Sequence, residues 1–278
     1  MIKNNNFIKV LSDEVTHPFR FSICTLVSKP DEYREMVESF LTAGFNPRLC
    51  EYLCIDNSSS NCYEAFSGIN RFLREAKGKY LIICHQDIVL HDSNINDLNS
   101  LIEQMDSIDS KWAILSNAGG INFKYLAMHV TQKSGKQLFE HFLPLKASTV
   151  DENFIVVKKE ANLALSDNLS GFHMYGTDIC LVADILGYTA YIIDFNLTHK
   201  SDGNVDKHFL KNRNDLMRKY RKALRGRFVS TTITRFYLSG NRLAYFLGNL
   251  PVVMFFVRQY YKYFRSKSNY HQTNQGVE

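Results

Sequence analysis

The chain has 278 residues, of which 45% are hydrophobic and 22% charged, a composition typical of a globular domain and not of a disordered chain. This length supports one sizeable core with a small appendage. The formal charge is +5, but nine basic residues fall between Lys207 and Arg227 against one acid, Asp215. The six cysteines form no Cys-x-x-Cys pair, and the first residues do not resemble a secretion leader. We therefore expect a reducing, cytosolic setting.

The first 116 residues alternate between predicted strands and helices. Apolar, β-rich runs predict strands, whereas apolar residues at helical spacing predict helices. The expected strands are 20–27, 51–56, 78–84 and 112–116, and the expected helices are 31–43, 62–77 and 95–108. This βαβαβ order favours a parallel sheet as the core.

The middle of the chain is less regular. Residues 117–120 (Asn-Ala-Gly-Gly) predict a turn that permits close backbone approach. Residues 121–145 mix strand and loop signals, which we interpret as a flap. A strand is expected at 152–158, and a helix is expected to begin near Asp178 and to end near Leu186. Another strand, 189–195, leads into the stretch that ends at His199.

The tail divides into a basic part and an apolar part. Residues 207–227 predict a strongly basic helix, and 243–257 are nearly apolar, although roughly 20 residues are needed to span a bilayer. Residues 260–265 are aromatic and basic, which suits a lipid headgroup layer. The alternative is a helix packed on the domain with solvated cations. We expect a catalytic domain at 1–205 and a helical, basic and amphipathic extension at 206–278.

The sequence His85-Gln86-Asp87 follows the apolar run 78–84 directly. Ligands of open α/β sheets gather outside the carboxyl ends of the strands. His85 and Asp87 are therefore candidates for a metal or phosphate site. An ordinary polar turn after a buried strand is the alternative.

Three further residues fall where strands or helices would present them: Asp56, Asp178 and His199. Carboxylate and imidazole groups together suit a divalent ion such as manganese or magnesium, which commonly bridges protein and diphosphate. An ionised aspartate nearby can take a proton from an incoming hydroxyl. Each residue also has a structural interpretation: Asp56 as a turn cap, Asp178 as a helix N-terminal residue, and His199 as a packed histidine.

Together these residues resemble family-2-type glycosyltransferases with the GT-A fold, in the bacterial branch that carries His-Gln-Asp in place of Asp-x-Asp. The family has an Asn eight residues before a Gly, and its acidic motif begins seven residues after that Gly. Asn70, Gly78 and His85 match this spacing. The first strand matches at 23–27, and the later helix at 172–181. The resemblance covers roughly residues 18–205.

This resemblance implies an α/β, GT-A-like (Rossmann-like) fold with a mostly parallel mixed sheet flanked by helices. It also implies residue roles. The donor would contact Val27, Asp56, Asn70, His85 and Asp87. Mn²⁺ or Mg²⁺ would bind Asp87 and His199, and Asp178 would be the general base. The acceptor would contact Gly119, Gly120, His173 and Tyr175.

The implied activity is an inverting transfer of a sugar from a nucleoside diphosphate, with a UDP-sugar preferred, to a hydroxyl of a saccharide or lipid-linked acceptor. The implied location is cytoplasmic, with the tail on an anionic membrane surface at the inner face of the cell membrane. The alternatives are a catalytically silent nucleotide- or sugar-binding scaffold and a nucleotidyltransferase. Ser28-Lys-Pro-Asp-Glu32 lacks the glycine-rich loop expected of the latter. A nucleic-acid partner is not expected, because the basic charge is confined to one tail segment.

Overall fold

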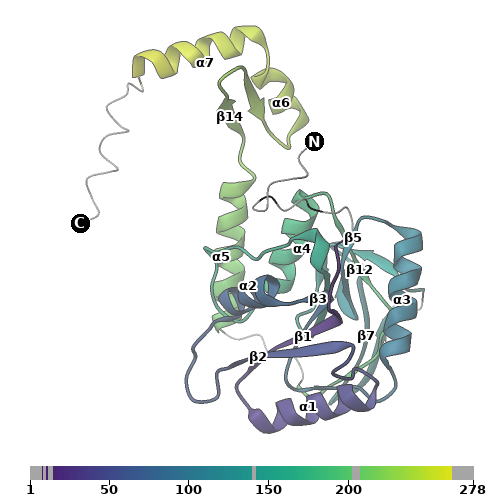
Figure 1. The fold of residues 1–278 in the computed structure, drawn as a ribbon. Helices are drawn as coiled ribbons and strands as arrows, with labels where there is room; N and C mark the ends of the chain where they lie inside the picture. Colours follow the sequence, from purple (N-terminus) through teal and green to yellow (C-terminus); the bar gives the residue numbers. More distant parts are fainter. Residues whose placement is uncertain (1–7, 9–10, 12–14, 140–141, 202–206, 265–278) are drawn as a thin grey trace. The chain divides into compact units, whose positions relative to one another are not determined.

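The computed structural model describes residues 8, 11, 15–139, 142–201 and 207–264 (Figure 1). The chain forms two compact units that divide after Leu216. Helix α5 (Lys207–Ala223) begins in the first unit and ends in the second. The functional division expected at residue 205 stays a prediction.

The first unit is built on a seven-stranded sheet with the order β2-β1-β3-β11-β5-β12-β9. Its strands are β1 (Phe19–Val27), β2 (Cys50–Asp56), β3 (Gly78–Cys84), β5 (Trp112–Ser116), β9 (Leu145–Ala147), β11 (Phe154–Lys158) and β12 (Thr189–Ile192). β1 runs parallel to β2 and β3, and β5 runs parallel to β12. β11 lies antiparallel between β3 and β5. The predicted α/β class with a mixed sheet is confirmed, and its antiparallel share is larger than expected.

A second sheet has the order β10-β6-β7-β13-β4, with β8 paired to β7. Its strands are β4 (Ile88–Val89), β6 (Ala118–Gly120), β7 (Leu126–Gln132), β8 (Gly135–Phe139), β10 (Thr149–Val150) and β13 (Thr198–His199). The turn predicted at 117–120 is therefore wrong, because Gly119 and Gly120 lie in β6. Close backbone approach is present there: a Cβ at Gly119 would lie 2.2 Å from the carbonyl oxygen of Thr149. The segment interpreted as a flap forms the β7–β8 hairpin and β9.

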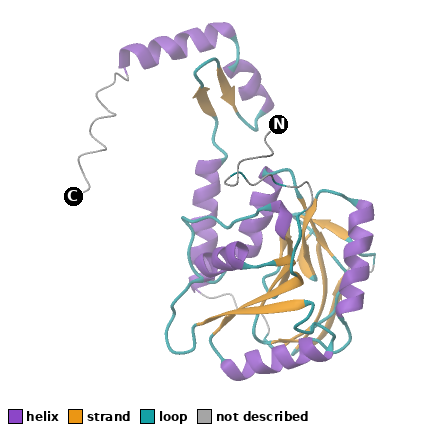
Figure 2. Cartoon of the chain, viewed as in Figure 1, coloured by secondary structure: helices purple, strands orange, loops and turns teal. Residues whose placement is uncertain are grey.

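Helices flank the main sheet (Figures 1 and 2). They are α1 (Pro30–Thr42), α2 (Ala65–Glu75), α3 (Ile95–Ile108) and α4 (Tyr175–Ile185). Phe40 of α1 and Leu98 of α3 join one buried cluster with Phe21 and Ile82 of the sheet. α2 packs with Gly68 against Leu26, so closely that a Cβ would lie 2.7 Å from the leucine side chain.

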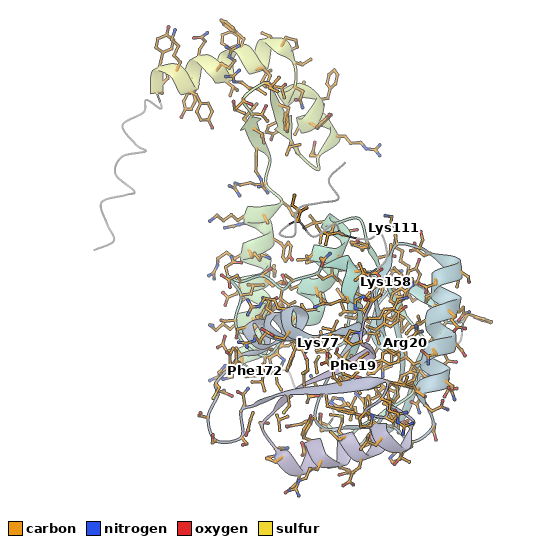
Figure 3. All side chains as sticks on the ribbon, in the orientation of Figure 1. Phe19, Arg20, Lys77, Lys111, Lys158 and Phe172 are labelled. Atoms are coloured by element: carbon orange, nitrogen blue, oxygen red, sulfur yellow. The ribbon has the colours of Figure 1, made fainter. Side chains whose placement is uncertain are left out.

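An aromatic pair closes one part of the sheet away from the strands' carboxyl ends. Tyr80 and Trp112 stack with ring centroids 5.8 Å apart. Arg20 lies 5.0 Å from the Tyr80 ring centroid, and Lys158 lies 4.0 Å from that of Trp112. Figure 3 labels both cations. Cations over aromatic faces add to the burial of these rings. These contacts therefore stabilise the fold in this region.

The second unit contains the end of α5, a hairpin of β14 (Arg227–Ser230) and β15 (Arg235–Leu238), and the helices α6 (Arg242–Gly248) and α7 (Pro251–Phe264). The helix predicted to reach Arg227 ends at Ala223. The apolar run at 243–257 splits at Pro251, since proline suits a first helical turn and not a helix interior. The side chain of Asn249 bonds to the backbone of Tyr237 and ties this break to the hairpin. Within the described chain, we find no helix with the length and apolar content needed to cross a bilayer.

Candidate metal and nucleotide site

The His85-Gln86-Asp87 turn lies where β1 and β3 end side by side. These strands are parallel, with Cys24 opposite Ile83, so their carboxyl ends share one edge of the sheet. The side-chain oxygen of Gln86 accepts hydrogen bonds from the backbone N–H groups of Ser28 (2.8 Å) and Lys29 (2.9 Å). The amide of Gln86 donates to the hydroxyl of Ser28. Gln86 therefore holds the loop after β1 against the turn after β3, a role the sequence analysis did not assign.

A short strand pairing brings His199 to this turn. β13 pairs antiparallel with β4, which places His199 opposite Ile88. The N–H of Lys200 donates to the carbonyl oxygen of Asp87. His199 is therefore fixed beside Asp87 although 112 positions separate them in the sequence.

Three potential ligand atoms meet at this point. His199 Nε2 lies 3.4 Å from Asp87 Oδ1, and His85 Nδ1 lies 3.4 Å from His199 Nε2. His85 Nδ1 lies 4.0 Å from Asp87 Oδ1, and all three atoms lie within 4.8 Å of one another. Two imidazole nitrogens and a carboxylate oxygen suit Mn²⁺ or another divalent ion. The donor set therefore fits the metal that the sequence predicted, with His85 as an additional ligand.

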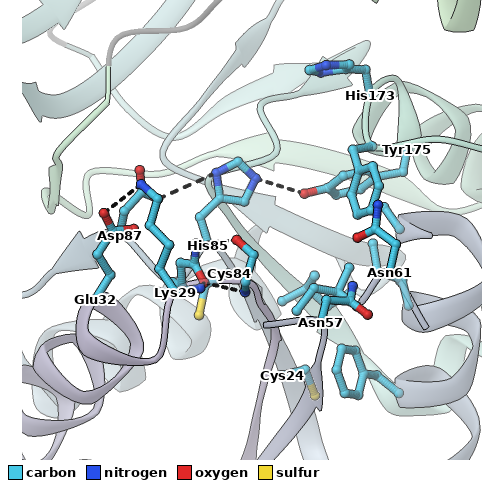
Figure 4. Close-up of a pocket in the computed structure, with 18 residues that line it drawn as sticks. Cys24, Lys29, Glu32, Asn57, Asn61, Cys84, His85, Asp87, His173 and Tyr175 are labelled. Carbon is cyan, nitrogen blue, oxygen red and sulfur yellow. Dashed lines mark hydrogen bonds and ion pairs between the residues drawn. The ribbon is translucent and has the colours of Figure 1, made fainter. Parts of the chain in front are cut away.

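Tyr175 sets the orientation of His85 (Figure 4). The phenol donates to the carbonyl oxygen of Glu152 at 3.1 Å and lies 3.0 Å from His85 Nε2. A phenol has one proton, so with that proton on the carbonyl its oxygen accepts from His85 Nε2–H. This tautomer leaves the lone pair of Nδ1 facing Asp87 and His199, as metal binding requires.

The electrostatics of the cluster keep Asp87 ionised. Burial and the neighbouring His199 lower the pKa of His85, although Asp87 opposes them. The imidazole of His85 is therefore neutral at physiological pH. Burial alone would raise the pKa of Asp87, but hydrogen bonding and charge from His199 outweigh it and hold that pKa well below its usual range. Asp87 is thus an ionised carboxylate beside a neutral imidazole.

A cavity of about 440 Å³ adjoins the cluster. Its floor is apolar and formed by Leu26, Ile69, Phe72 and Ile83. Its polar lining comprises Lys29, Glu32, Asn57, Asn61, Gln86, His173 and the cluster residues His85 and Asp87. An apolar floor with a few convergent polar groups is the usual form of a small-molecule site.

The predicted donor residues are only partly brought together. Val27 and Asp56 are register partners at the ends of β1 and β2. The carboxylate of Asp56 accepts from the N–H of Ser58, and hydrogen bonding to Ser58 lowers its pKa. The next residue, Asn57, lines the cavity. Asn70 lies elsewhere: its amide donates to and accepts from the backbone of Leu165, beside a second cavity.

The predicted base, Asp178, is fully buried in the first turn of α4. Its two oxygens accept hydrogen bonds from the backbone N–H and the hydroxyl of Ser166, each at 2.7 Å. It does not line the cavity beside the metal cluster. Asp151, in contrast, is exposed and its charge acts on His85.

The predicted acceptor residues divide between two cavities. His173 and Tyr175 line the cavity beside the metal cluster. Gly119 and Gly120 line a separate hollow of about 220 Å³ together with Asp151. Asp151 therefore lies beside the glycine pair, and its charge also acts on Tyr175.

The sequence analysis also missed Glu152. Its carboxylate accepts from the N–H of Gly176 at the start of α4. Burial raises the pKa of Glu152 to about 8, although hydrogen bonds from backbone N–H groups at the start of α4 act to lower it. The one available signal was the helix start near residue 175, because an acid is favoured at a helix N-terminus.

Comparisons with known proteins identify a relative by sequence and partial likenesses by structure. No protein-family model matches the chain. GalNAc-T7, solved with UDP, GalNAc and Mn²⁺, matches 70% of this chain with a TM-score of 0.49 and 10% identity, and the chain spans less than half (46%) of that protein. The second structure is the mannosyltransferase PcManGT from Pyrobaculum calidifontis, solved with GDP-Man and Mn²⁺. The match covers 77% of this chain and 68% of the PcManGT chain, with a TM-score of 0.47 and 12% identity.

The sequence relative is the "ATP synthase subunits region ORF 6" protein of Fuscovulum blasticum. It is 33% identical over 236 residues, which cover 83% of this chain and 95% of the relative. The chain belongs to the same family as the ORF 6 protein of Fuscovulum blasticum.

Proposed function

We propose that this protein is a metal-dependent glycosyltransferase that moves a sugar from a nucleoside diphosphate to a hydroxyl group. One observation carries the proposal: His85, Asp87 and His199 converge at the carboxyl end of the sheet, beside a cavity with an apolar floor. An apolar floor suits a nucleoside, and a cation site at its edge suits the diphosphate. These residues also follow one another along the chain in the order that the resemblance to GT-A glycosyltransferases implies, which supports the same proposal.

His85, Asp87 and His199 would hold the metal, Mn²⁺ or Mg²⁺. When bound, a divalent ion supplies positive charge that offsets the charge of a departing diphosphate. The protein supplies the orientation: Tyr175 fixes the ring of His85, and Gln86 fixes the turn that carries Asp87.

We propose donor contacts from Val27, Asp56, Asn57 and Lys29 around the cavity. Val27 and Asp56 end neighbouring parallel strands, and Asn57 and Lys29 line the cavity itself. The ammonium of Lys29 is largely exposed and forms an ion pair with Glu32 at 2.8 Å. Both charges lie at the rim, where a diphosphate or a sugar hydroxyl would meet them.

The general base takes the acceptor proton as the hydroxyl attacks the anomeric carbon and the bond to the diphosphate breaks. The resemblance assigns this role to Asp178, which we keep as the first proposal. The carboxylate of Asp178 accepts hydrogen bonds from Ser166. To act as the base, it would have to exchange a hydrogen bond from Ser166 for one from the acceptor hydroxyl. Asp151 is the second candidate, since it is exposed beside Gly119 and Gly120 and its charge acts on Tyr175.

The acceptor we propose is a saccharide or a lipid-linked saccharide, and the preferred donor is a UDP-sugar. The location we propose is cytoplasmic, at the inner face of the cell membrane. A binding scaffold without turnover is the second candidate function, favoured by the burial of Asp178.

A donor panel distinguishes these functions. Nucleoside-diphosphate sugars are incubated with the full chain and Mn²⁺, with and without a chelator, and released nucleoside diphosphate is measured. We expect metal-dependent release for one donor and its loss in Asp87→Asn. Glu103→Gln, an exposed acid on α3, is the matched control and keeps activity. Donor binding without release would support the scaffold, and absence of donor binding would contradict both.

A further inference from the structure

The second unit has a charge unlike that of the rest of the chain. Residues 217–278 contain twelve Lys and Arg and one acid, Glu278. The segment therefore carries a formal +11, and since the whole chain is +5, residues 1–216 carry −6. No acid occurs between 217 and 264, so no carboxylate in this stretch offsets its positive charge. Charge of one sign on one segment favours an anionic partner.

The same unit exposes a continuous apolar face on α7. One side of the helix carries residues at positions i, i+3, i+4, i+8, i+11 and i+12, which are Val252, Phe255, Phe256, Tyr260, Tyr263 and Phe264. Each of these side chains is between 51% and 77% exposed. Met254 and Val257, which line the groove beside the β14–β15 hairpin, are half-buried. One face of α7 therefore packs within its own unit, and the other face is exposed.

Helix α6 extends this apolar surface. Leu243, Tyr245, Phe246 and Leu247 are all exposed, and α6 packs against both α7 and β15. A contiguous face of this kind marks an interaction site, whereas scattered apolar residues do not. Burying each large side chain stabilises a complex, so such a face is expected to have an occupant.

Cations and apolar groups also share a groove within the unit. The groove, of about 730 Å³, runs between the β14–β15 hairpin and α7. Arg235, Arg258 and Lys262 line it together with Phe228, Val229, Met254 and Val257. Cations above an apolar floor match a lipid, whose phosphate meets the cations while its chains meet the floor.

We propose that residues 217–264, here termed the docking unit, bind the surface of an anionic phospholipid bilayer. α6 and α7 would lie in the interface, with Phe256 and Phe264 among the acyl chains and Arg258 and Lys262 at the phosphates. At 14 residues, α7 is about 21 Å long and lies on the bilayer instead of crossing it. A nucleic acid would match the charge but not the aliphatic part of the face. This inference does not depend on the proposed sugar transfer.

The test uses the full chain and lipid vesicles, without donor or metal. Co-sedimentation compares vesicles of phosphatidylcholine alone with vesicles that also contain phosphatidylglycerol. We expect binding to the anionic vesicles at least ~10-fold tighter than to the neutral ones, weakening at ~1 M salt. Equal binding to both would overturn the assignment to an anionic surface.

Paired variants identify the face. Phe256→Ser with Phe264→Ser removes exposed rings and should lower binding by at least ~10-fold. Arg258→Gln with Lys262→Gln should lower it by roughly 25-fold, at ~5-fold per cation. Phe123→Ser with Phe142→Ser, which removes exposed rings from the first unit, is the control and should bind like wild type. All of these side chains are exposed, and circular dichroism checks that each variant folds.

A fluorescent reporter gives an independent readout. The single tryptophan, Trp112, is fully buried, so a Phe256→Trp variant reports the docking unit against a constant background. We expect a blue shift of its emission with anionic vesicles. Two results would overturn the proposal: a dimer in light scattering that Phe256→Ser with Phe264→Ser dissociates, without vesicle binding, or salt-sensitive RNA binding in place of vesicle binding.

Discussion

The phenol oxygen of Tyr175 lies 3.0 Å from Nε2 of His85, and its proton is donated to the carbonyl oxygen of Glu152. One hydroxyl thus connects the start of α4 and the segment before β11 to a candidate metal ligand. This arrangement explains how the imidazole of His85 can serve as a ligand beside the carboxylate of Asp87. His85 is held in the tautomer whose free lone pair faces Asp87 and His199.

Tyr175→Phe removes this hydroxyl and is expected to weaken Mn²⁺ binding by about 10- to 100-fold, the usual effect of losing a partner of a metal ligand. Titration calorimetry with Mn²⁺ measures the change without any substrate. Tyr125→Phe, at an exposed position, is the matched control. An Mn²⁺ affinity equal to that of wild type would show that Tyr175 does not position His85.

Gln86→Ala removes three hydrogen bonds that join the loop after β1 to the turn after β3. We expect a loss of about 1–3 kcal/mol in the free energy of unfolding, since each bond contributes on the order of 1 kcal/mol. Nucleotide affinity should fall with it, because Lys29 and Asp87 lie on either side of this contact. Urea denaturation and nucleotide titration check the two effects. Gln86→Glu keeps the acceptor oxygen and should lose less stability than Gln86→Ala.

Asp178→Asn tests the proposed base. We expect transfer to fall by about 100-fold or more while donor affinity stays within about twofold. The variant also sets an amide against Ser166, which costs about 1–3 kcal/mol of stability. Thermal unfolding separates this cost from the loss of a base, and Asp151→Asn is the comparison. Loss of transfer in Asp151→Asn with retention in Asp178→Asn would move the role to Asp151.

Glu152 predicts a pH dependence of stability. Its folded-state pKa of about 8 lies above the ~4.3 of an exposed glutamate. The folded state therefore binds the proton more tightly, and the free energy of unfolding falls as the pH rises from about 5 to about 8. The slope is at most about 1.4 kcal/mol per pH unit. Urea denaturation across this range should show a smaller slope for Glu152→Gln than for wild type. Glu103→Gln should keep the wild-type slope, and a wild-type slope in Glu152→Gln would contradict the assignment.

Local patterns in the sequence predicted much of the fold. β1, β2, β3 and β5 are apolar runs of strand length, and α1, α2 and α3 carry helical spacing, so hydrophobic period was sufficient. The place of β11 was not predicted, because an antiparallel strand between β3 and β5 is a long-range pairing with no local signal. The β14–β15 hairpin was missed although Gly226 disfavours a helix interior and Phe228, Val229, Phe236 and Tyr237 are residue types enriched in strands.

The candidate site was predictable in part for the same reason. Spacing along the chain placed His85 and Asp87 at a strand end, which depends on one local element. The proximity of His199 to Asp87 depends on the two-residue pairing of β13 with β4. Only the resemblance indicated that these two residues would lie together. Spacing also placed Asp178 in the first turn of a helix, but the direction of its side chain depends on how α4 packs against Ser166.

The central claim is that His85, Asp87 and His199 bind a divalent metal that in turn binds a nucleoside diphosphate. Calorimetric titration of UDP into the full chain, with Mn²⁺ or with a chelator, tests it most directly. We predict UDP binding that is at least ~10-fold tighter with Mn²⁺, and we predict that Asp87→Asn removes this difference while Glu103→Gln keeps it. UDP binding that is identical with and without Mn²⁺, or a difference that survives in Asp87→Asn, would contradict the account.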